Sequence, residues 1–108
     1  MKYPLNLNNA LFWPYIPMML KSVDSKKIRQ LAEKYSAKRI LLFGSAAAGG
    51  DFRDIDLAVE GVRPEQFFKF YSELLWSLSK PVDLVDLSEK SLFSRLIESE
   101  GTLLYAAN

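Results

Sequence analysis

Short strand-like runs alternate with helical segments along most of this chain, and this alternation limits the folds that it can adopt. Apolar residues recur at helical spacing in the segments 24–35, 64–78 and 89–99. Four short runs have the composition of β-strands, at 39–43, 54–60, 82–87 and 102–105. The predicted order is therefore α-β-β-α-β-α-β. A chain of 108 residues suits one domain with one core, so we predict a single α/β domain over residues 21–108.

Each predicted helix has a recognisable end and an expected apolar face. Asp24 and Ser25 are suited to cap the start of the first helix. Pro64 opens the second helix at a favoured position, and Gly101 is suited to end the third. The side chains expected to face the core from the second and third helices are Phe67, Phe68, Tyr71, Leu74, Leu75, Leu78, Leu92, Phe93, Leu96 and Ile97.

Residues 1–20 differ from the rest of the chain in composition. They are dense in prolines and aromatic residues, which are Pro4, Pro14, Pro17, Tyr3, Phe12, Trp13 and Tyr15. We predict an irregular arm packed on the domain; the alternative is a docking surface for another chain. The apolar stretch 10–20 is too short for a transmembrane helix and is interrupted by proline. With no convincing signal sequence either, we expect a cytoplasmic protein.

The residue types that are missing exclude several kinds of chemistry. The chain has no His and no Cys, which excludes a Ser-His-Asp triad, an imidazole base, a thiolate nucleophile and a Cys-based metal site. A metal ion would therefore be a hard cation on oxygen ligands. The net charge of +1 argues against nucleic acid as a partner. The basic stretch 21–39 is predicted to be a solvated helix face, with a patch for phosphates or an acidic partner as the alternative.

A strand that runs into a glycine-serine turn is the first of three features that indicate chemistry. Gly44 follows the strand 39–43, and Ser45 begins a run of small residues that extends to Gly50. Glycine lets the backbone approach a ligand closely, and successive N–H groups in such a turn can bind phosphate oxygens. The turn alone is weak evidence, because many such turns have only a structural role.

Two carboxylates at the start of the next strand are the second feature. Asp54 and Asp56 lie two residues apart, so in a strand they point to the same face. Like charges at this spacing repel each other, and the pair is costly unless a cation lies between the two groups. Mg²⁺, held by both carboxylates and by substrate phosphates, would supply that cation. The alternative is a frayed strand start in water.

A third acidic residue interrupts the β-branched run 82–87. Asp83 lies where packing alone would favour Val or Ile. If this strand lies beside the strand of Asp54 and Asp56, Asp83 completes a cluster of three carboxylates. Asp86 should face the opposite side of a regular strand, so Asp83 is the favoured third member. A phosphate-binding turn and a carboxylate cluster in one sheet suit phosphoryl or nucleotidyl transfer, in which a second metal or a carboxylate activates the attacking hydroxyl.

These motifs, in this order, resemble the polymerase-β-type nucleotidyltransferase superfamily, and the size of the chain resembles that of its minimal members. They are Gly44-Ser45, Asp54-Ile55-Asp56-Leu57, Val82-Asp83-Leu84-Val85 and the C-terminal stretch 93–105. The resemblance covers about residues 25–106. It implies a small mixed sheet with flanking helices, similar to the palm of a polymerase. It also implies that Gly44 and Ser45 hold the phosphates of an NTP such as ATP, and that Asp54, Asp56 and Asp83 bind two Mg²⁺ ions.

Minimal members of this superfamily are commonly antitoxins paired with a HEPN-domain ribonuclease toxin, and some transfer AMP from ATP to a tyrosine of that toxin. The resemblance therefore implies a nucleotidyltransferase that modifies a HEPN toxin. The loop 46–53 is shorter than is usual in the family, and Ala48 stands where many members have a basic residue. Arg53, beside Asp54, would compensate as a phosphate ligand. The alternative is a binding module with little catalysis that neutralises a toxin by complex formation, and a homo-oligomer also stays open.

Overall fold

The computed structural model describes residues 20–48 and 51–108, so the predicted arm lies outside the described residues except for Leu20. The helices are α2 (Ser22–Lys34), α3 (Gly44–Ala47), the 3₁₀ turn η2 (Pro64–Gln66), α4 (Phe67–Ser77) and α5 (Leu92–Glu100). The strands are β1 (Arg39–Phe43), β2 (Ile55–Glu60), β3 (Val82–Asp86) and β4 (Thr102–Ala106). None of the helices in this part of the chain is long and apolar enough to cross a lipid bilayer.

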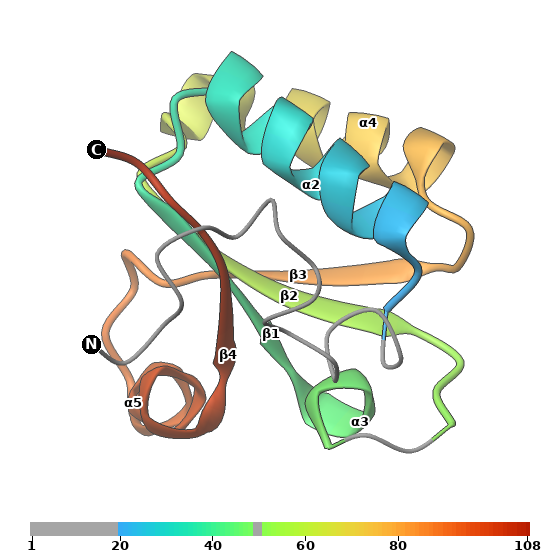
Figure 1. The fold of residues 1–108 in the computed structure, drawn as a ribbon. Coiled ribbons are helices and arrows are strands. Elements are labelled where there is room, and N and C mark those ends of the chain that lie inside the picture. The colour runs from blue at the N-terminus through green and yellow to red at the C-terminus, as the bar shows by residue number, and fades with distance from the viewer. Residues whose placement is uncertain (1–19, 49–50) are drawn as a thin grey trace.

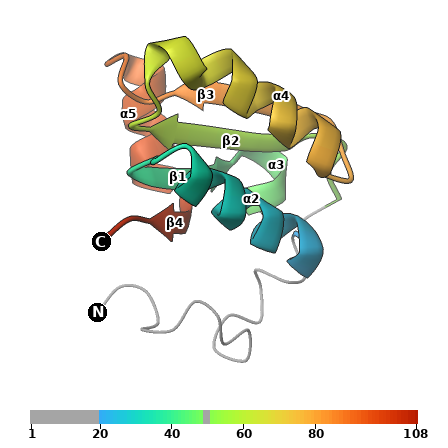
Figure 2. The same cartoon turned by 90° about the horizontal axis from the view of Figure 1, so that it is seen from above.

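The strands form one mixed sheet in the order β3-β2-β1-β4. β1 pairs antiparallel with both β2 and β4, whereas β2 and β3 run parallel. Parallel neighbours need a crossover connection, and α4 supplies it. Helices α2 and α4 lie side by side over one face of the sheet, and α5 lies against the other (Figures 1 and 2). The predicted α/β class with flanking helices is confirmed.

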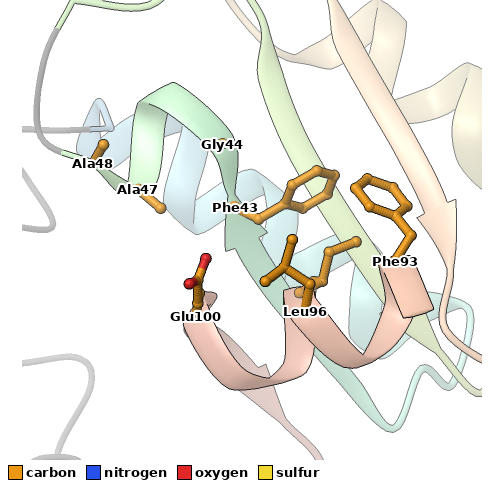
Figure 3. Close-up of a pocket in the computed structure, with 8 residues that line it drawn as sticks. Phe43, Gly44, Ala47, Ala48, Phe93, Leu96 and Glu100 are labelled. Atoms are coloured by element: carbon orange, nitrogen blue, oxygen red, sulfur yellow. The ribbon is translucent and has the colours of Figure 1, made fainter. Parts of the chain in front are cut away.

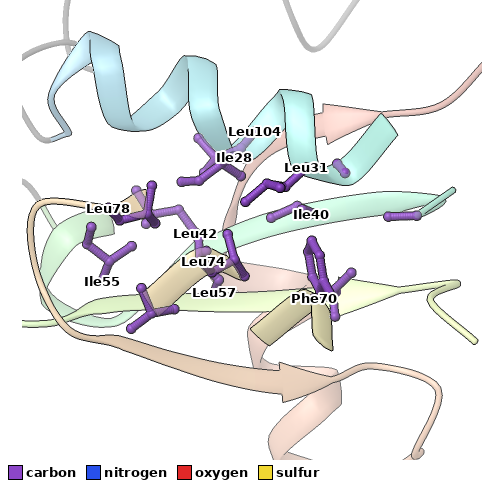
Figure 4. Close-up of a cluster of buried hydrophobic side chains, with 14 of the residues drawn as sticks. Ile28, Leu31, Ile40, Leu42, Ile55, Leu57, Phe70, Leu74, Leu78 and Leu104 are labelled. Atoms are coloured by element: carbon purple, nitrogen blue, oxygen red, sulfur yellow. The ribbon is translucent and has the colours of Figure 1, made fainter. Parts of the chain in front are cut away.

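The main core fills the space between the sheet and the pair of helices α2 and α4 (Figure 4). Its fully buried strand residues are Ile40, Leu42, Ile55, Leu57 and Val59. A smaller apolar cluster lies on the opposite face and consists of Leu41, Ala58, Leu87 and Ile97, with Phe43 packed against it. Because successive strand residues point to opposite faces, Asp56 shares this second face with Ala58. The charged side of the sheet is therefore the side of α5.

Two helices bury only part of the face predicted for them, and Leu74, Leu78 and Ile97 are buried as expected. In α4, Phe70 is fully buried, whereas Phe68 and Leu75, which were expected in the core, are 79% and 48% exposed. In α5, the expected core residues Leu92, Phe93 and Leu96 are 83%, 52% and 51% exposed. The predicted faces were too wide, because apolar residues occupy much of each helix's circumference and their spacing alone does not say which of them the sheet covers.

The start of α2 also differs from the prediction. The helix begins at Ser22, and no side chain caps it. Asp24 is buried in the first turn, where its carboxylate accepts hydrogen bonds from the backbone N–H of Ser79 at 3.1 Å and from the Ser79 hydroxyl at 2.5 Å. Its predicted capping role is wrong because its partner comes from a segment 55 residues away. At the end of α5 the predicted cap is confirmed, since the Gly101 N–H donates to the carbonyl of Ile97 at 2.7 Å.

Candidate active site

The Gly44-Ser45 turn lies at the end of β1. Instead of an open loop, Gly44–Ala47 form a single helical turn, α3, that follows the strand directly. Gly44 has a φ of +71°, in the left-handed region that favours glycine. A side chain at position 44 would overlap the carboxylate of Asp56. Glycine is therefore required both for the turn and for the approach of Asp56 to the backbone.

The first two candidate carboxylates lie at the start of β2. Asp54 directly precedes the strand and is exposed, and Asp56 is the second residue of the strand and is half-buried. Ile55, between them, is fully buried in the main core. Asp56 is paired with Phe43 across the antiparallel ladder of β1 and β2. This register brings the Asp56 carboxylate to the Gly44 turn.

The third candidate carboxylate lies beside Asp56 on the neighbouring strand. The parallel register of β2 and β3 pairs Asp56 with Asp83, so the two side chains share one face of the sheet. Asp86 lies at the other end of β3, where its carboxylate accepts hydrogen bonds from the Ser88 backbone N–H at 2.9 Å and hydroxyl at 2.7 Å. The structure therefore places Asp83, and not Asp86, beside Asp56.

Crowding of negative charge affects the titration of Asp56. Burial raises the pKa of the Asp56 carboxyl above its ordinary value, and the negative charges of Asp83 and Asp54 raise it further. All three influences disfavour the ionised form. A cation bound beside Asp56 would offset the repulsion from Asp83 and Asp54, because its positive charge attracts all three carboxylates.

The donor set fits a hard divalent cation, although the protein supplies only part of its coordination. Within the described ranges, no group of three acidic side chains is placed to hold a metal ion by itself. Mg²⁺ commonly binds through one or two carboxylates and completes its coordination with water and substrate phosphates. Ser45, in α3, and Arg53, directly before Asp54, are both exposed and accessible to such phosphates.

A pocket of about 430 Å³ borders this site, between α3 and α5 (Figure 3). It is lined by Phe43, Gly44, Ala47, Ala48, Phe93, Leu96, Ile97 and Glu100. The rings of Phe43 and Phe93 meet edge to face, with 5.8 Å between their centroids. Since Gly44 adjoins both the pocket and Asp56, a ligand at the carboxylates would lie next to an apolar hollow.

Lys80 contacts the segment that leads into Asp54. Its Nζ donates to the carbonyl of Phe52 at 2.8 Å and lies 4.1 Å from the centroid of the Phe52 ring. The two residues are 28 positions apart and belong to no motif. No sequence signal therefore points to this contact.

A glycine-serine turn beside carboxylates on a mixed sheet is the arrangement expected of enzymes that transfer nucleotides. Residues 26–108 match the family described as polymerase beta, nucleotidyltransferase. The chain belongs to this family, and the resemblance seen in the sequence is confirmed.

Solved structures of toxin–antitoxin complexes contain chains similar to this one. One, a toxin–antitoxin with AMP-PNP, has 28% identity and a TM-score of 0.65, with 78% of this chain and 74% of that chain covered. Another, MntA-HepT, has 25% identity and a TM-score of 0.63, with coverages of 81% and 74%. A third, from Shewanella oneidensis, is a tri-AMPylated HEPN toxin with its MNT antitoxin, at 27% identity, a TM-score of 0.61 and coverages of 78% and 71%. No curated protein matches the chain.

Proposed function

We propose that this protein is a cytoplasmic, Mg²⁺-dependent nucleotidyltransferase that moves AMP from ATP to a hydroxyl group of a partner HEPN toxin and so acts as its antitoxin. The observation that carries the proposal is the pairing of Asp56 with Asp83 beside Gly44, in a chain of the nucleotidyltransferase family. Two of the similar solved complexes, one with AMP-PNP and one with an AMPylated HEPN toxin, support ATP as donor and a toxin as acceptor.

Each residue of the site has its own role in this transfer. Asp54 and Asp56 would hold a divalent ion, which when bound neutralises charge on the triphosphate. The exposed Gly44-Ser45 turn donates N–H and hydroxyl groups to phosphate oxygens, and Arg53 adds a positive charge beside them. The family resemblance implies that two Mg²⁺ ions bind at this site.

The reaction exchanges one phosphorus–oxygen bond for another. The acceptor hydroxyl oxygen bonds to the α-phosphorus of ATP, and the bond from that phosphorus to the bridging oxygen breaks, so that pyrophosphate leaves. Asp83 is exposed beside Asp56, where its carboxylate can accept the proton of the attacking hydroxyl.

Transfer of label tests the proposal. The protein is incubated with Mg²⁺, the candidate toxin and ATP radiolabelled at the α-phosphate, and labelled toxin is the expected product. Asp54→Asn and Asp56→Asn should each abolish labelling. Asp51→Asn is the matched control, because Asp51 is an exposed acid close to Asp54 in the chain. A folded wild-type protein that labels no toxin would contradict the proposal.

A second candidate function is neutralisation by binding, with little catalysis. Large apolar side chains are exposed on α4 and α5, among them Phe68 at 79%, Trp76 at 89% and Leu92 at 83%, and such surfaces favour protein partners. This candidate predicts that Asp56→Asn still neutralises the toxin. It also predicts that deletion of residues 1–19, which spares the buried Leu20, weakens neutralisation more than Asp56→Asn does.

A further inference from the structure

We propose that Lys80 is a positioning residue that holds the segment of Asp54 in place for metal binding, an inference that rests on the proposed nucleotidyl transfer. Lys80 lies two residues before β3 and outside the motifs shared with the family. Its ammonium group makes two contacts to one residue, a hydrogen bond of 2.8 Å to the Phe52 carbonyl and a cation–π contact of 4.1 Å to the Phe52 ring. Both kinds of contact strengthen where water is partly excluded.

The segment 52–55 is held at both of its ends by residues 80 and 81. Lys80 binds Phe52, and the backbone N–H of Ile55 donates to the carbonyl of Pro81 at 2.8 Å. The Phe52 ring also packs against the main core. Asp54 lies between these two attachments, so its backbone is fixed although its side chain is exposed.

The register of β2 and β3 relates this segment to the other two carboxylates. Lys80 precedes β3, and Asp83, three residues further along the chain, is paired with Asp56. A shift of the segment 52–54 relative to β3 would therefore move Asp54 away from the other two acids. Metal sites respond strongly to such changes, since loss of a residue that holds a ligand in place commonly costs about 10–100-fold in metal affinity.

A lysine near a nucleotide site can instead bind phosphate directly. The Lys80 ammonium contacts both the carbonyl and the ring of Phe52, which favours the positioning role. The two roles also act at different times. A phosphate ligand matters only when nucleotide is bound, whereas a positioning contact restrains the segment 52–55 in the free protein as well.

Two variants and a control separate these roles. Lys80→Met keeps the length of the side chain and removes its charge, and Lys80→Arg keeps a donor and a cation over the ring. Lys90→Met is the matched control, because Lys90 is an exposed lysine in the turn before α5 that makes a 3.6 Å ion pair with Glu98. Circular dichroism establishes that each variant is folded.

Hydrogen exchange of the ligand-free protein is the first readout. Lys80→Met should speed amide exchange in 52–55 by roughly tenfold, which corresponds to the loss of one charge-assisted hydrogen bond. The second readout is Mn²⁺ affinity in the presence of AMP-PNP, measured by electron paramagnetic resonance. It should fall by about tenfold or more in Lys80→Met and return close to the wild-type value in Lys80→Arg.

Four results would overturn the inference, the last of them together with the proposed function. Unchanged exchange in 52–55 of Lys80→Met would show that the contact does not restrain the segment. Weaker AMP-PNP binding with normal exchange would identify Lys80 as a direct phosphate ligand. If the wild type binds Mn²⁺ and Lys80→Met binds it with the same affinity, the inference about Lys80 is contradicted but the proposed function is not. In contrast, a wild-type protein that binds no Mn²⁺ with AMP-PNP would contradict the proposed function as well.

Discussion

Gly44 and Asp56 determine each other's positions in the site. The positive φ of Gly44 turns the chain from β1 into α3, and the missing side chain leaves room for the Asp56 carboxylate. Neither requirement is visible from one residue alone. The pair explains why glycine follows β1 at position 44.

Gly44→Ala tests this dependence. The added methyl group enters a left-handed backbone conformation and overlaps the Asp56 carboxylate, so we expect a loss of about 1–3 kcal/mol in the free energy of unfolding and of AMP transfer. Urea denaturation measures the first effect. Ala48→Gly, at an exposed position close by, is the control for backbone changes in this turn. A Gly44→Ala protein with wild-type stability and activity would contradict the proposed dependence.

Asp56→Asn should separate catalysis from stability. The folded protein raises the pKa of Asp56 through burial and through the charges of Asp83 and Asp54, so ionised Asp56 destabilises the folded state at neutral pH. The variant should therefore lose AMP transfer while its melting temperature stays unchanged or rises. The penalty disappears as the pH falls below the ordinary value of 3.8, so the advantage of the variant should shrink in acid. Thermal unfolding at neutral and acidic pH checks both signs, and a variant that is less stable at neutral pH would refute this explanation.

At the scale of helices and strands, patterns of neighbouring residues predict the elements themselves, but they do not predict the contacts between residues that are far apart in the sequence. The run 39–43 coincides with β1, and the alternation of side chains along a strand correctly predicts that Asp83, and not Asp86, lies beside Asp56. The exposed stripe of α5 was missed, since burial depends on how far the sheet extends over it. The partners of Asp24 and Lys80 were missed as well, because both contacts join segments that no local pattern relates.

The bond between Asp24 and Ser79 links the start of α2 to the segment before β3. The Asp24 carboxylate is buried and accepts two hydrogen bonds from Ser79, so Asp24→Ala should cost about 1–3 kcal/mol. Ser79→Ala should cost less, because the backbone N–H remains. In a double-mutant cycle followed by urea denaturation, we expect a coupling energy above about 0.5 kcal/mol. Additive effects of the two changes would show that the contact contributes nothing specific.

In the molecule as a whole, one face of the sheet forms the main core and the other carries the acidic residues of the site. Helices α2 and α4 cover one face and form the main core with it. On the other face, α5 packs on a small cluster and leaves Asp83 exposed and Asp56 half-exposed. A hydroxyl group of a partner protein can therefore approach from this face. The exposed apolar residues of α5 border the same approach.

At the centre of the proposed function, Asp54 and Asp56 bind a divalent ion within reach of the Gly44-Ser45 turn, and Asp83 lies beside Asp56 on β3. A crystal structure of the protein with AMP-PNP and Mn²⁺, with the metal located from its anomalous signal, tests this most directly. We predict Mn²⁺ bound by the carboxylates of Asp54 and Asp56, with phosphate oxygens at the backbone N–H groups of the turn and Asp83 facing the α-phosphate. Bound AMP-PNP with Mn²⁺ ligated by none of these carboxylates would contradict the claim.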